Sequence, residues 1–376
     1  MIRLGLNLLL NGKQDIINQR QVGLITNQTG VNENLDCNVD LLSAFCCISA
    51  LFSPEHGFFG NAQDGQKISS SIDKRQLIPI HSLYADKRKP TQEMVDGLDM
   101  LIYDIQDVGS RFYTYISTLF LSMETASECG IDFVVLDRPN PISGILVEGN
   151  ILDPEFKSFV GPHPMPMRHG MTVGELAQLF RAEMDLDLSL TVVPMEGWER
   201  WMWFDQTGLQ WVPPSPNMPT VETAMVYPGM CLIEGTNLSE GRGTTKPFEW
   251  IGAPWIDGYD LAEKLNQLNL GGVLFRQIHF KPEFSKYAKE MCHGVQIHIT
   301  DRLTARPIEI SLHLISIVIA SYPDQFEFRS RFFNLLAGTD KIQEALLNNK
   351  SITKISQSWQ YKSMQFEKKR QAHLIY

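Results

Sequence analysis

Short apolar segments alternate with helical patterns along the first half of the chain, and no other feature of the sequence restricts the fold as strongly. In order along the chain, the segments cover residues 22–26, 39–45, 48–52, 91–98, 100–105, 113–129 and 133–136. The first, third, fifth and seventh are predicted strands, apolar almost throughout, and the others are predicted helices. Such strands are typical of a parallel sheet that is buried under helices on both faces. The pattern therefore predicts an α/β domain.

The alternation continues beyond residue 170 and then gives way to a long irregular segment. Thr172 and Glu175 have the spacing of a capping box, which predicts a helix from there to about Glu183. A strand is predicted at residues 188–193. Residues 194–253 follow, and they are rich in proline, glycine and tryptophan. Irregular segments of this length are usually functional or disordered, and the aromatic content argues against disorder.

The residue pattern changes once more near Pro254. From there the predicted helices and strands cover residues 260–268, 273–280, 295–299, 307–321 and 339–348, followed by a helical tail. We predict two domains, an α/β catalytic domain over residues 1–253 and a smaller α+β domain over residues 254–376. The second domain is expected to complete the cleft in which the site lies.

Charge and composition exclude several classes of protein. The net charge of −10 argues against nucleic-acid binding, which needs a basic surface. No apolar run approaches the roughly 18 residues that suggest a membrane span. The N-terminus lacks the features of a signal peptide, so the protein as written is expected in the cytoplasm, or exported if its N-terminus was trimmed. The six cysteines lack CxxC and zinc spacing and are expected to be core residues in a reducing compartment.

Three of the predicted strands end in polar loops, at residues 53–57, 104–109 and 137–141. Ligands of open parallel sheets bind beyond the carboxyl ends of the strands. The side chains expected to converge there are Glu55, Asp104, Asp107, Asp137 and Arg138. An acid at a strand end often caps the next helix, so each residue taken alone has a structural alternative. Three such loops at successive strand ends favour a ligand-binding site over three separate helix caps.

Motifs of other chemistries are missing from the sequence. It contains no GxGxxG after a strand, no GxxxxGK[ST], no GxSxG and no HExxH. His163 and His169 could bind a metal, but their proline-rich setting predicts hydrogen bonds within a loop, and no metal site is predicted. Acid catalysis by carboxylates remains, and glycoside hydrolysis is its commonest form.

The irregular segment carries a second group of candidate binding residues. Glycines near Glu240 and Arg242 allow a ligand to approach the backbone. The two charged side chains could bind a polar, partly anionic ligand. The alternative is a tight turn with a local salt bridge. Four tryptophans could stack on sugars, although packing inside the protein is expected for most of them: Trp198, Trp201, Trp203 and Trp211.

Long motifs follow one another along nearly the whole chain. They are SPEHGFFG (53–60), DIQDVGSRFYTYIST (104–118), VVLDRPNPISG (134–144), FVGPHPMPMRHGMTVGELA (159–177), WVPPSPNMPT (211–220), LIEGTNLSEGRGTTKPFEWIGAPW (232–255), SKYAKEMCHGVQIHITD (285–301) and LAGTD (336–340). Together they resemble one family, the bacterial exo-β-N-acetylmuramidases. Motifs of this length make a chance similarity implausible.

The resemblance implies a fold, an activity and a set of site residues. It implies a Rossmann-like parallel-sheet N-terminal domain, a smaller C-terminal domain, and a site in the cleft that needs no organic cofactor. The implied activity is release of N-acetylmuramic acid from the non-reducing end of peptidoglycan fragments, either MurNAc-GlcNAc oligosaccharides or muropeptides. Glu55 of the EHG motif is the leading catalytic residue. The substrate contacts implied by the motifs are His56, Arg111, Tyr115, Arg138, Asn140, Asn217, Glu234, Asn237 and Arg242.

Glu55 is predicted to be the general acid, since the leaving-group oxygen needs a proton. Its catalytic partner is Asp107, Asp104 or Glu240. Carboxyl groups about 5–5.5 Å apart would mean retention of configuration, and about 6.5–9.5 Å would mean inversion. Assistance by the acetamido group of the substrate is a third route.

The lactyl carboxylate of muramic acid must be held by local cations, because the net charge of −10 repels it. Arg111 and Arg242 are the favoured candidates, ahead of Arg138, which lies beside Asp137. Two alternative functions remain. The protein could hydrolyse another amino sugar, such as N-acetylglucosamine, or it could bind muropeptides without catalysis.

Overall fold

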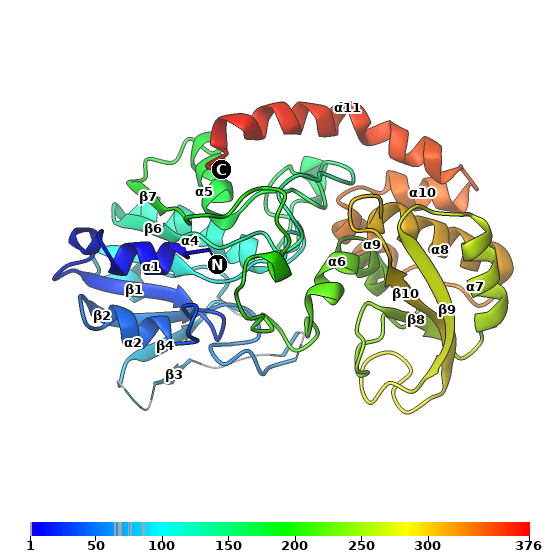
Figure 1. The fold of residues 1–376 in the computed structure, drawn as a ribbon, viewed down its shortest axis with the longest axis horizontal. Helices are drawn as coiled ribbons and strands as arrows, with labels where there is room; N and C mark the ends of the chain where they lie inside the picture. The colour runs from blue at the N-terminus through cyan, green and yellow to red at the C-terminus, as the bar shows by residue number, and fades with distance from the viewer. Residues whose placement is uncertain (1, 64, 67–69, 74, 76, 85–86) are drawn as a thin grey trace.

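The chain forms two lobes, and its longest helix runs from one lobe to the other (Figure 1). The computed structural model describes residues 2–63, 65–66, 70–73, 75, 77–84 and 87–376. The N-terminal lobe, on the left of Figure 1, contains a mostly parallel sheet, and the C-terminal lobe contains a smaller antiparallel sheet.

A seven-stranded sheet forms the centre of the N-terminal lobe in the described part of the chain. Its strands are β1 (Gln21–Thr26), β2 (Cys47–Ser53), β3 (Ser71–Ile72), β4 (Pro79–Ser82), β5 (Met100–Asp104), β6 (Asp132–Leu136) and β7 (Leu190–Val193). Their spatial order is β3-β4-β2-β1-β5-β6-β7, and every pair is parallel except β3 with β4. When the parallel strands are numbered along the chain, this order is 3-2-1-4-5-6, the Rossmann order. The predicted Rossmann-like sheet is confirmed.

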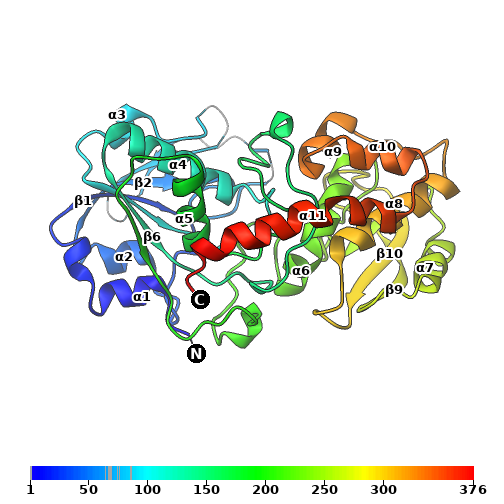
Figure 2. The same ribbon diagram turned by 90° about the horizontal axis from the view of Figure 1, so that it is seen from above.

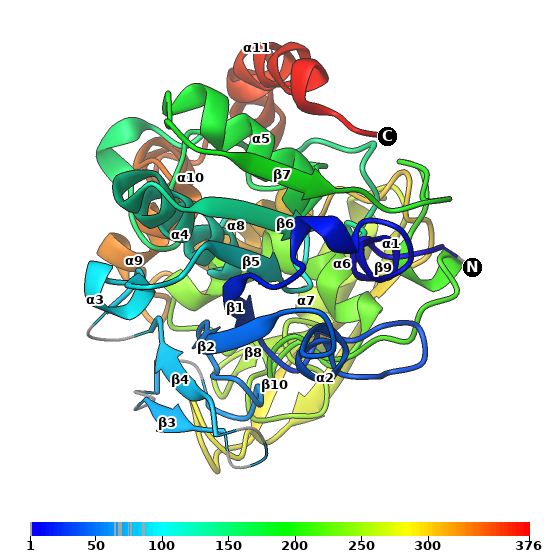
Figure 3. The same ribbon diagram turned by 90° about the vertical axis from the view of Figure 1, so that its left-hand side faces the viewer.

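Helices cover both faces of this sheet (Figure 3). They are α1 (Gly5–Leu10) and α2 (Asn38–Leu42) on one face, and α3 (Gln92–Val95), α4 (Tyr115–Cys129) and α5 (Val173–Glu183) on the other. Successive residues of a strand point to opposite faces, so Leu24 joins one hydrophobic cluster and Ile25 the other. Because both rows of side chains are buried in the central strands β1, β2, β5 and β6, these strands are apolar over most of their length.

Two helix ends follow local signals in the sequence. Gly130 ends α4 in the left-handed conformation, with φ of 65°. At the start of α5, the Thr172 side chain accepts from the Glu175 N–H, and the Glu175 carboxylate accepts from the Thr172 N–H. This is the predicted capping box.

The C-terminal lobe is built on an antiparallel sheet in the order β8-β10-β9. Its elements are α6 (Val221–Met230), β8 (Trp250–Ala253), α7 (Gly258–Gln267), β9 (Val273–Phe280), β10 (Cys292–Ile299), α8 (Pro307–Ser321), α9 (Ser330–Ala337) and α10 (Lys341–Leu347). This smaller α+β lobe agrees with the fold class predicted from the sequence. The suggested boundary after residue 253 falls within the lobe, since β8 precedes it and pairs with β10.

Helix α6 lies within the segment that the sequence pattern described as irregular. Pro228 and Gly229 stand in its last turns and look like helix breakers. Tertiary contact explains the glycine, because a Cβ added at Gly229 would lie 1.8 Å from the carbonyl oxygen of Pro307. The glycine therefore lets α6 pack closely against the start of α8, which a local pattern does not reveal.

Helix α11 (Ile352–Arg370) joins the two lobes. It starts beside α10 in the C-terminal lobe and ends near α5 in the N-terminal lobe, as the view from above shows (Figure 2). Among the described residues, none of the helices has both the length and the apolar character needed to cross a bilayer.

Candidate active site

The loop after β2 presents Glu55 through an unusual backbone turn. His56 has φ of 72° and Gly57 has φ of 79°, both in the left-handed region. A residue other than glycine is held there only when its surroundings fix it, and such strain is common at functional sites. The Nδ1 atom of His56 lies 2.8 Å from the carbonyl oxygen of Ala62, which fixes the imidazole ring.

A cavity of about 360 Å³ lies at this loop and is lined by both lobes. The N-terminal lobe contributes, among others, Glu55, His56, Tyr84, Arg88, Tyr113 and Thr114. The C-terminal lobe contributes, among others, Tyr227, Glu234, Arg242 and Phe248. Ser215 and Asn217 come from the segment that connects the lobes, and the Asn217 amide donates to Gln63 Oε1 at 3.3 Å.

Glu55 is almost completely buried in the wall of the cavity, with 4% of its surface exposed. The Thr114 hydroxyl, just before α4, donates a hydrogen bond of 2.7 Å to Glu55 Oε2. Within the described part of the chain, Oε1 accepts no hydrogen bond. One oxygen is thus held in place, and the other is available to a ligand.

Aromatic rings form an apolar wall beside this carboxyl group. Tyr227 packs edge-on against Phe112, Tyr113 and Phe248, with ring centroids 5.3, 5.9 and 4.8 Å away. Burial raises the pKa of Tyr113 and of Tyr227, so both phenols stay neutral. Aromatic surface with a few polar groups is the usual lining of a small-molecule site.

Charged residues of the C-terminal lobe form an alternating chain that begins at the cavity. Arg242 Nη2 lies 2.8 Å from Glu234 Oε1, and Arg242 Nε lies 3.5 Å from Glu240 Oε1. Lys286 Nζ lies 2.9 Å from Glu240 Oε2. Glu240 is buried behind the lining residues, so the structure places it in a salt-bridge network and not in the cavity wall. Burial lowers the pKa of Lys286, and the charge of Glu240 opposes that shift.

The other two strand-end loops use their acids inside the protein. Asp104 is fully buried and accepts from Arg138 Nε at 2.6 Å and from the Asn38 amide at 2.7 Å. Asp107 accepts from the Gly109 N–H at 2.6 Å and lies 3.5 Å from the ring of His169. The described lining of the cavity includes none of these acids.

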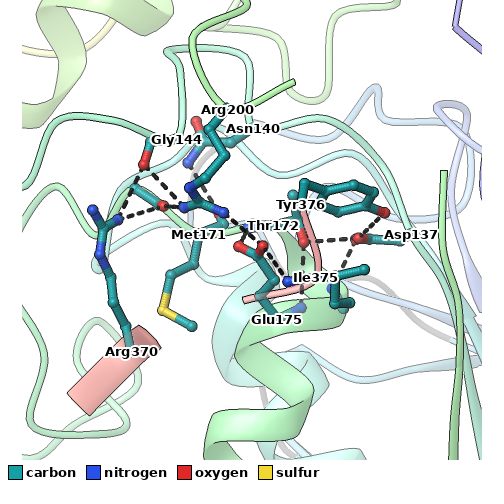
Figure 4. Close-up of polar contacts among 12 residues, drawn as sticks. Asp137, Asn140, Gly144, Met171, Thr172, Glu175, Arg200, Arg370, Ile375 and Tyr376 are labelled. Atoms are coloured by element: carbon teal, nitrogen blue, oxygen red, sulfur yellow. Dashed lines mark hydrogen bonds and ion pairs between the residues drawn. The ribbon is translucent and has the colours of Figure 1, made fainter. Parts of the chain in front are cut away.

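Asp137, at the end of β6, anchors a contact between distant parts of the chain (Figure 4). Its two oxygens accept from four donors: the Arg138 and Gly174 N–H groups, the Thr172 hydroxyl and the Tyr376 hydroxyl. This arrangement ties the residues after α11 to the start of α5. Asp137 therefore lies in a structural network rather than in the crevice expected from the sequence.

Arg111 is fully buried and holds the lobes together. Its guanidinium donates to the carbonyl oxygens of Asn150 and Met165 in the N-terminal lobe, and to those of Leu336 and Ala337 at the end of α9. Burial lowers its pKa to about 9. Because Arg111 is fully buried, contacts four carbonyl groups through its two Nη atoms and is not among the described cavity-lining residues, it is not placed to bind the lactyl group of a substrate.

Three further binding candidates contact the backbone. The Asn140 amide donates to the Met171 carbonyl, the Asn237 amide donates to the Gln325 carbonyl, and the Tyr115 hydroxyl donates to the Pro214 carbonyl. These contacts stabilise the loops that carry the motifs. The described lining of the cavity includes none of the three side chains.

The tryptophans and histidines of the irregular segments also pack within the protein. Trp198 and Trp203 are buried, Trp211 packs on the main core, and Trp201 is exposed. His169 is buried, and its Nδ1 accepts from the Met171 N–H. In the part of the chain that the structure describes, no three or more His, Cys, Asp or Glu residues are grouped so as to hold a metal ion.

Several cavity residues were not singled out from the sequence. Tyr113 and Thr114 lie inside the motif of residues 104–118, so the motif itself was the available signal. Arg88 lies in no motif, and its position follows only from the folding of the chain between β4 and α3.

Known proteins resemble this chain along its whole length. Residues 22–222 match the family described as "Exo-beta-N-acetylmuramidase NamZ, N-terminal", and residues 225–376 match its C-terminal counterpart. Peptidoglycan beta-N-acetylmuramidase NamZ of Bacillus subtilis (strain 168) is 49% identical over 378 residues, which cover 100% of this chain and 91% of the relative.

Two crystal structures of DUF1343 family proteins from Bacteroides fragilis NCTC 9343 have the same fold. One is 37% identical with a TM-score of 0.94, and the other is 32% identical with a TM-score of 0.79. Each comparison covers 100% of this chain and 99% of the other.

Proposed function

Because this chain belongs to the exo-β-N-acetylmuramidase NamZ family, we propose that it is a glycoside hydrolase that releases N-acetylmuramic acid from peptidoglycan fragments. The observation that carries the proposal is the buried Glu55 carboxyl in the wall of a cavity lined by both lobes. A volume of about 360 Å³ is near the lower end for ligand pockets, roughly 300–1,000 Å³. It suits one terminal sugar, as an exo-acting enzyme requires.

Glu55 acts in this proposal as the general acid. Its proton passes to the glycosidic oxygen while the bond from that oxygen to the anomeric carbon breaks. Thr114 holds Oε2, which leaves Oε1 to carry the proton. The proposed substrates are MurNAc-GlcNAc oligosaccharides or muropeptides with N-acetylmuramic acid at the non-reducing end.

The test is turnover of the disaccharide MurNAc-GlcNAc, compared with the reversed disaccharide GlcNAc-MurNAc. We expect Glu55→Gln to fold normally and to lose about 10²- to 10⁴-fold in kcat on MurNAc-GlcNAc, as for removal of a general acid. Glu93→Gln, at an exposed position of α3, is the control and should keep full activity. Turnover of GlcNAc-MurNAc alone would favour an N-acetylglucosaminidase, and binding without turnover would favour a binding protein.

The lactyl carboxylate needs a cation, and the structure changes the order of candidates. Arg138 pairs with Asp104, Arg111 contacts carbonyl groups, and Arg242 pairs with Glu234. Arg88 lines the cavity, and its guanidinium lies 4.8 Å from the ring centroid of Phe159. In the described part of the chain, Arg88 forms no salt bridge. We therefore propose Arg88 as the residue that reads the lactyl group.

Arg88→Met keeps an apolar side chain of similar length and removes the guanidinium that lies over Phe159. We expect kcat/KM for MurNAc-GlcNAc to fall, with a loss of transition-state stabilisation of about 1–3 kcal/mol. This lies between the values for exposed and buried charge pairs. The same substitution should leave kcat/KM unchanged for a substrate in which a neutral methylamide replaces the lactyl carboxylate. Lys89→Met is the matched control, since Lys89 pairs with Glu128 and does not line the cavity. Equal losses on both substrates would mean that Arg88 supports the site without reading the carboxylate.

A further inference from the structure

We propose that Glu234 is the second catalytic carboxylate, supplied by the C-terminal lobe to act opposite Glu55. The inference rests on the proposed function and assigns the partner that the acid requires. Among the described residues that line the cavity, Glu55 and Glu234 are the acidic ones. The acids of the strand-end loops, Asp104 and Asp107, contact other parts of the N-terminal lobe.

The two carboxyl groups have partners of different charge. Glu55 accepts from the neutral hydroxyl of Thr114, whereas Glu234 lies 2.8 Å from the guanidinium of Arg242. An adjacent positive charge favours the ionised form of a carboxyl group, and a neutral donor does so far less. In enzymes, two carboxyl groups with such contrasting surroundings commonly take different catalytic roles, one as acid and the other as base. Glu234 is therefore assigned the role of the base in this proposal.

The surroundings of Glu234 hold it in place. It lies on the 3-10 helix Cys231–Gly235, and Lys286 Nζ donates to the carbonyl oxygens of Ile233, Glu234 and Leu238. Behind it, a Cβ added at Gly235 would lie 2.5 Å from the Cα of Phe333, so this helix is packed tightly against α9. A catalytic group needs a fixed position of this kind.

The size of the cavity brings both groups to one sugar. In glycosidases that use an acid and a water-activating base, the two carboxyl groups lie about 6.5–9.5 Å apart, on either side of the scissile bond. Glu55 comes from the N-terminal lobe and Glu234 from the C-terminal lobe, and both line the same space of about 360 Å³. A single N-acetylmuramic acid residue bound there contacts both walls.

The chemical step balances with these two groups and one water molecule. Glu55 gives its proton to the glycosidic oxygen, and the electron pair of the breaking bond stays on that oxygen. Water adds to the anomeric carbon, and Glu234 accepts the proton that this water loses. The products are free N-acetylmuramic acid and the shortened fragment, and proton exchange with solvent restores both carboxyl groups.

Substrates with different leaving groups distinguish the acid role of Glu55 from the base role of Glu234. Wild type, Glu55→Gln and Glu234→Gln are each assayed on MurNAc-GlcNAc and on 4-nitrophenyl β-N-acetylmuraminide, whose leaving group needs little protonation. We expect Glu55→Gln to lose activity mainly on the disaccharide. Glu234→Gln should lose about 10²- to 10⁴-fold in kcat on both substrates, because the need for a base remains. Glu344→Gln, at an exposed position of α10, is the control.

Two further variants keep the test decisive if Glu234→Gln folds poorly. Glu234→Asp keeps the charge next to Arg242 but withdraws the carboxylate by one methylene, so kcat should fall with little change in thermal stability. Glu234→Ala should regain turnover in azide and form a glycosyl azide of inverted configuration. Near-wild-type turnover of the nitrophenyl glycoside by folded Glu234→Gln would overturn the inference. If wild type hydrolyses neither substrate, the proposed function itself fails.

Discussion

The position of the Glu55 carboxyl is set by its immediate neighbours in the chain and in space. The left-handed backbone at His56 and Gly57 turns the chain sharply after β2, and the Thr114 hydroxyl fixes one carboxyl oxygen. That hydroxyl does not cap α4, so its hydrogen bond serves Glu55 rather than the helix. Thr114 is therefore a positioning residue in the proposed mechanism.

Replacing Thr114 tests this role with a closely matched pair. Thr114→Val removes the donor at nearly constant shape. We expect the activation free energy on MurNAc-GlcNAc to rise by about 1.5–3 kcal/mol, which lowers kcat, with KM little changed. Thr114→Ser restores the hydroxyl and should recover most of the activity. Equal impairment of both variants would assign the threonine to packing. Steady-state kinetics on the two variants decide between these outcomes.

Helix α11 acts as a link between the lobes because the residues at its far end are anchored. The Arg370 guanidinium donates to the carbonyl oxygens of Gly144, Ile145, His169 and Gly170. Figure 4 shows its contact with Gly144. Beyond the helix, the Tyr376 hydroxyl donates to Asp137 and accepts from the Met195 N–H. An element that begins in one lobe thus ends on the other.

Tyr376→Phe removes the hydroxyl from this anchor and leaves the ring. At pH 8, above the pKa of about 7 to which burial raises Asp137, we expect the free energy of unfolding to fall by about 1.5–3 kcal/mol, the value for a hydrogen bond to a charged group. The matched control is Tyr361→Phe on α11, where the tyrosine is 68% exposed and the change should stay within about 0.5 kcal/mol. Urea unfolding of both variants provides the measurement. Equal effects at the two positions would contradict the anchoring role.

At the scale of the whole molecule, buried polar contacts join the lobes that form the cavity. Arg111 reaches the carbonyl groups at the end of α9, and Glu148 accepts from the Ile308 N–H at the start of α8 at 2.9 Å. In the described part of the chain, the second oxygen of Glu148 is buried without a hydrogen-bond partner. Burial raises the pKa of Glu148 to about 7.

This raised pKa gives the stability a defined dependence on pH. Between about pH 4.5 and pH 7 the folded state holds a proton on Glu148 that the unfolded state has lost, so the contribution of this group falls as pH rises. Glu148→Gln cannot ionise and should gain stability relative to wild type over that window, by at most about 3 kcal/mol. Urea unfolding at pH 5 and pH 8 measures the difference, and Glu93→Gln is the control. A parallel pH dependence in wild type and Glu148→Gln would rule out this assignment.

The sequence by itself determined the elements whose signals are local. A strand buried on both faces must be apolar throughout, so β1, β2, β5 and β6 were visible as apolar runs. The apolar helix predicted at residues 307–321 coincides with α8, and the capping box marked the start of α5. Helix α6 was missed because Pro228 and Gly229 look like helix breakers, and the close contact with α8 that explains Gly229 is a tertiary one.

Only the tertiary structure decided which charged side chains share the cavity. The strand-end position of Asp104 was correct, but its partners, Arg138 and Asn38, come from other loops of the sheet. Glu55 and Glu234 lie far apart in the chain and line one cavity because the two lobes pack against each other. Local patterns report burial and periodicity along one segment, whereas the pairing of charges depends on strand order and lobe packing. For that reason the motifs revealed the family and Glu55, and the fold was needed to see that Glu234, expected from the motifs as a substrate contact, lines the same cavity.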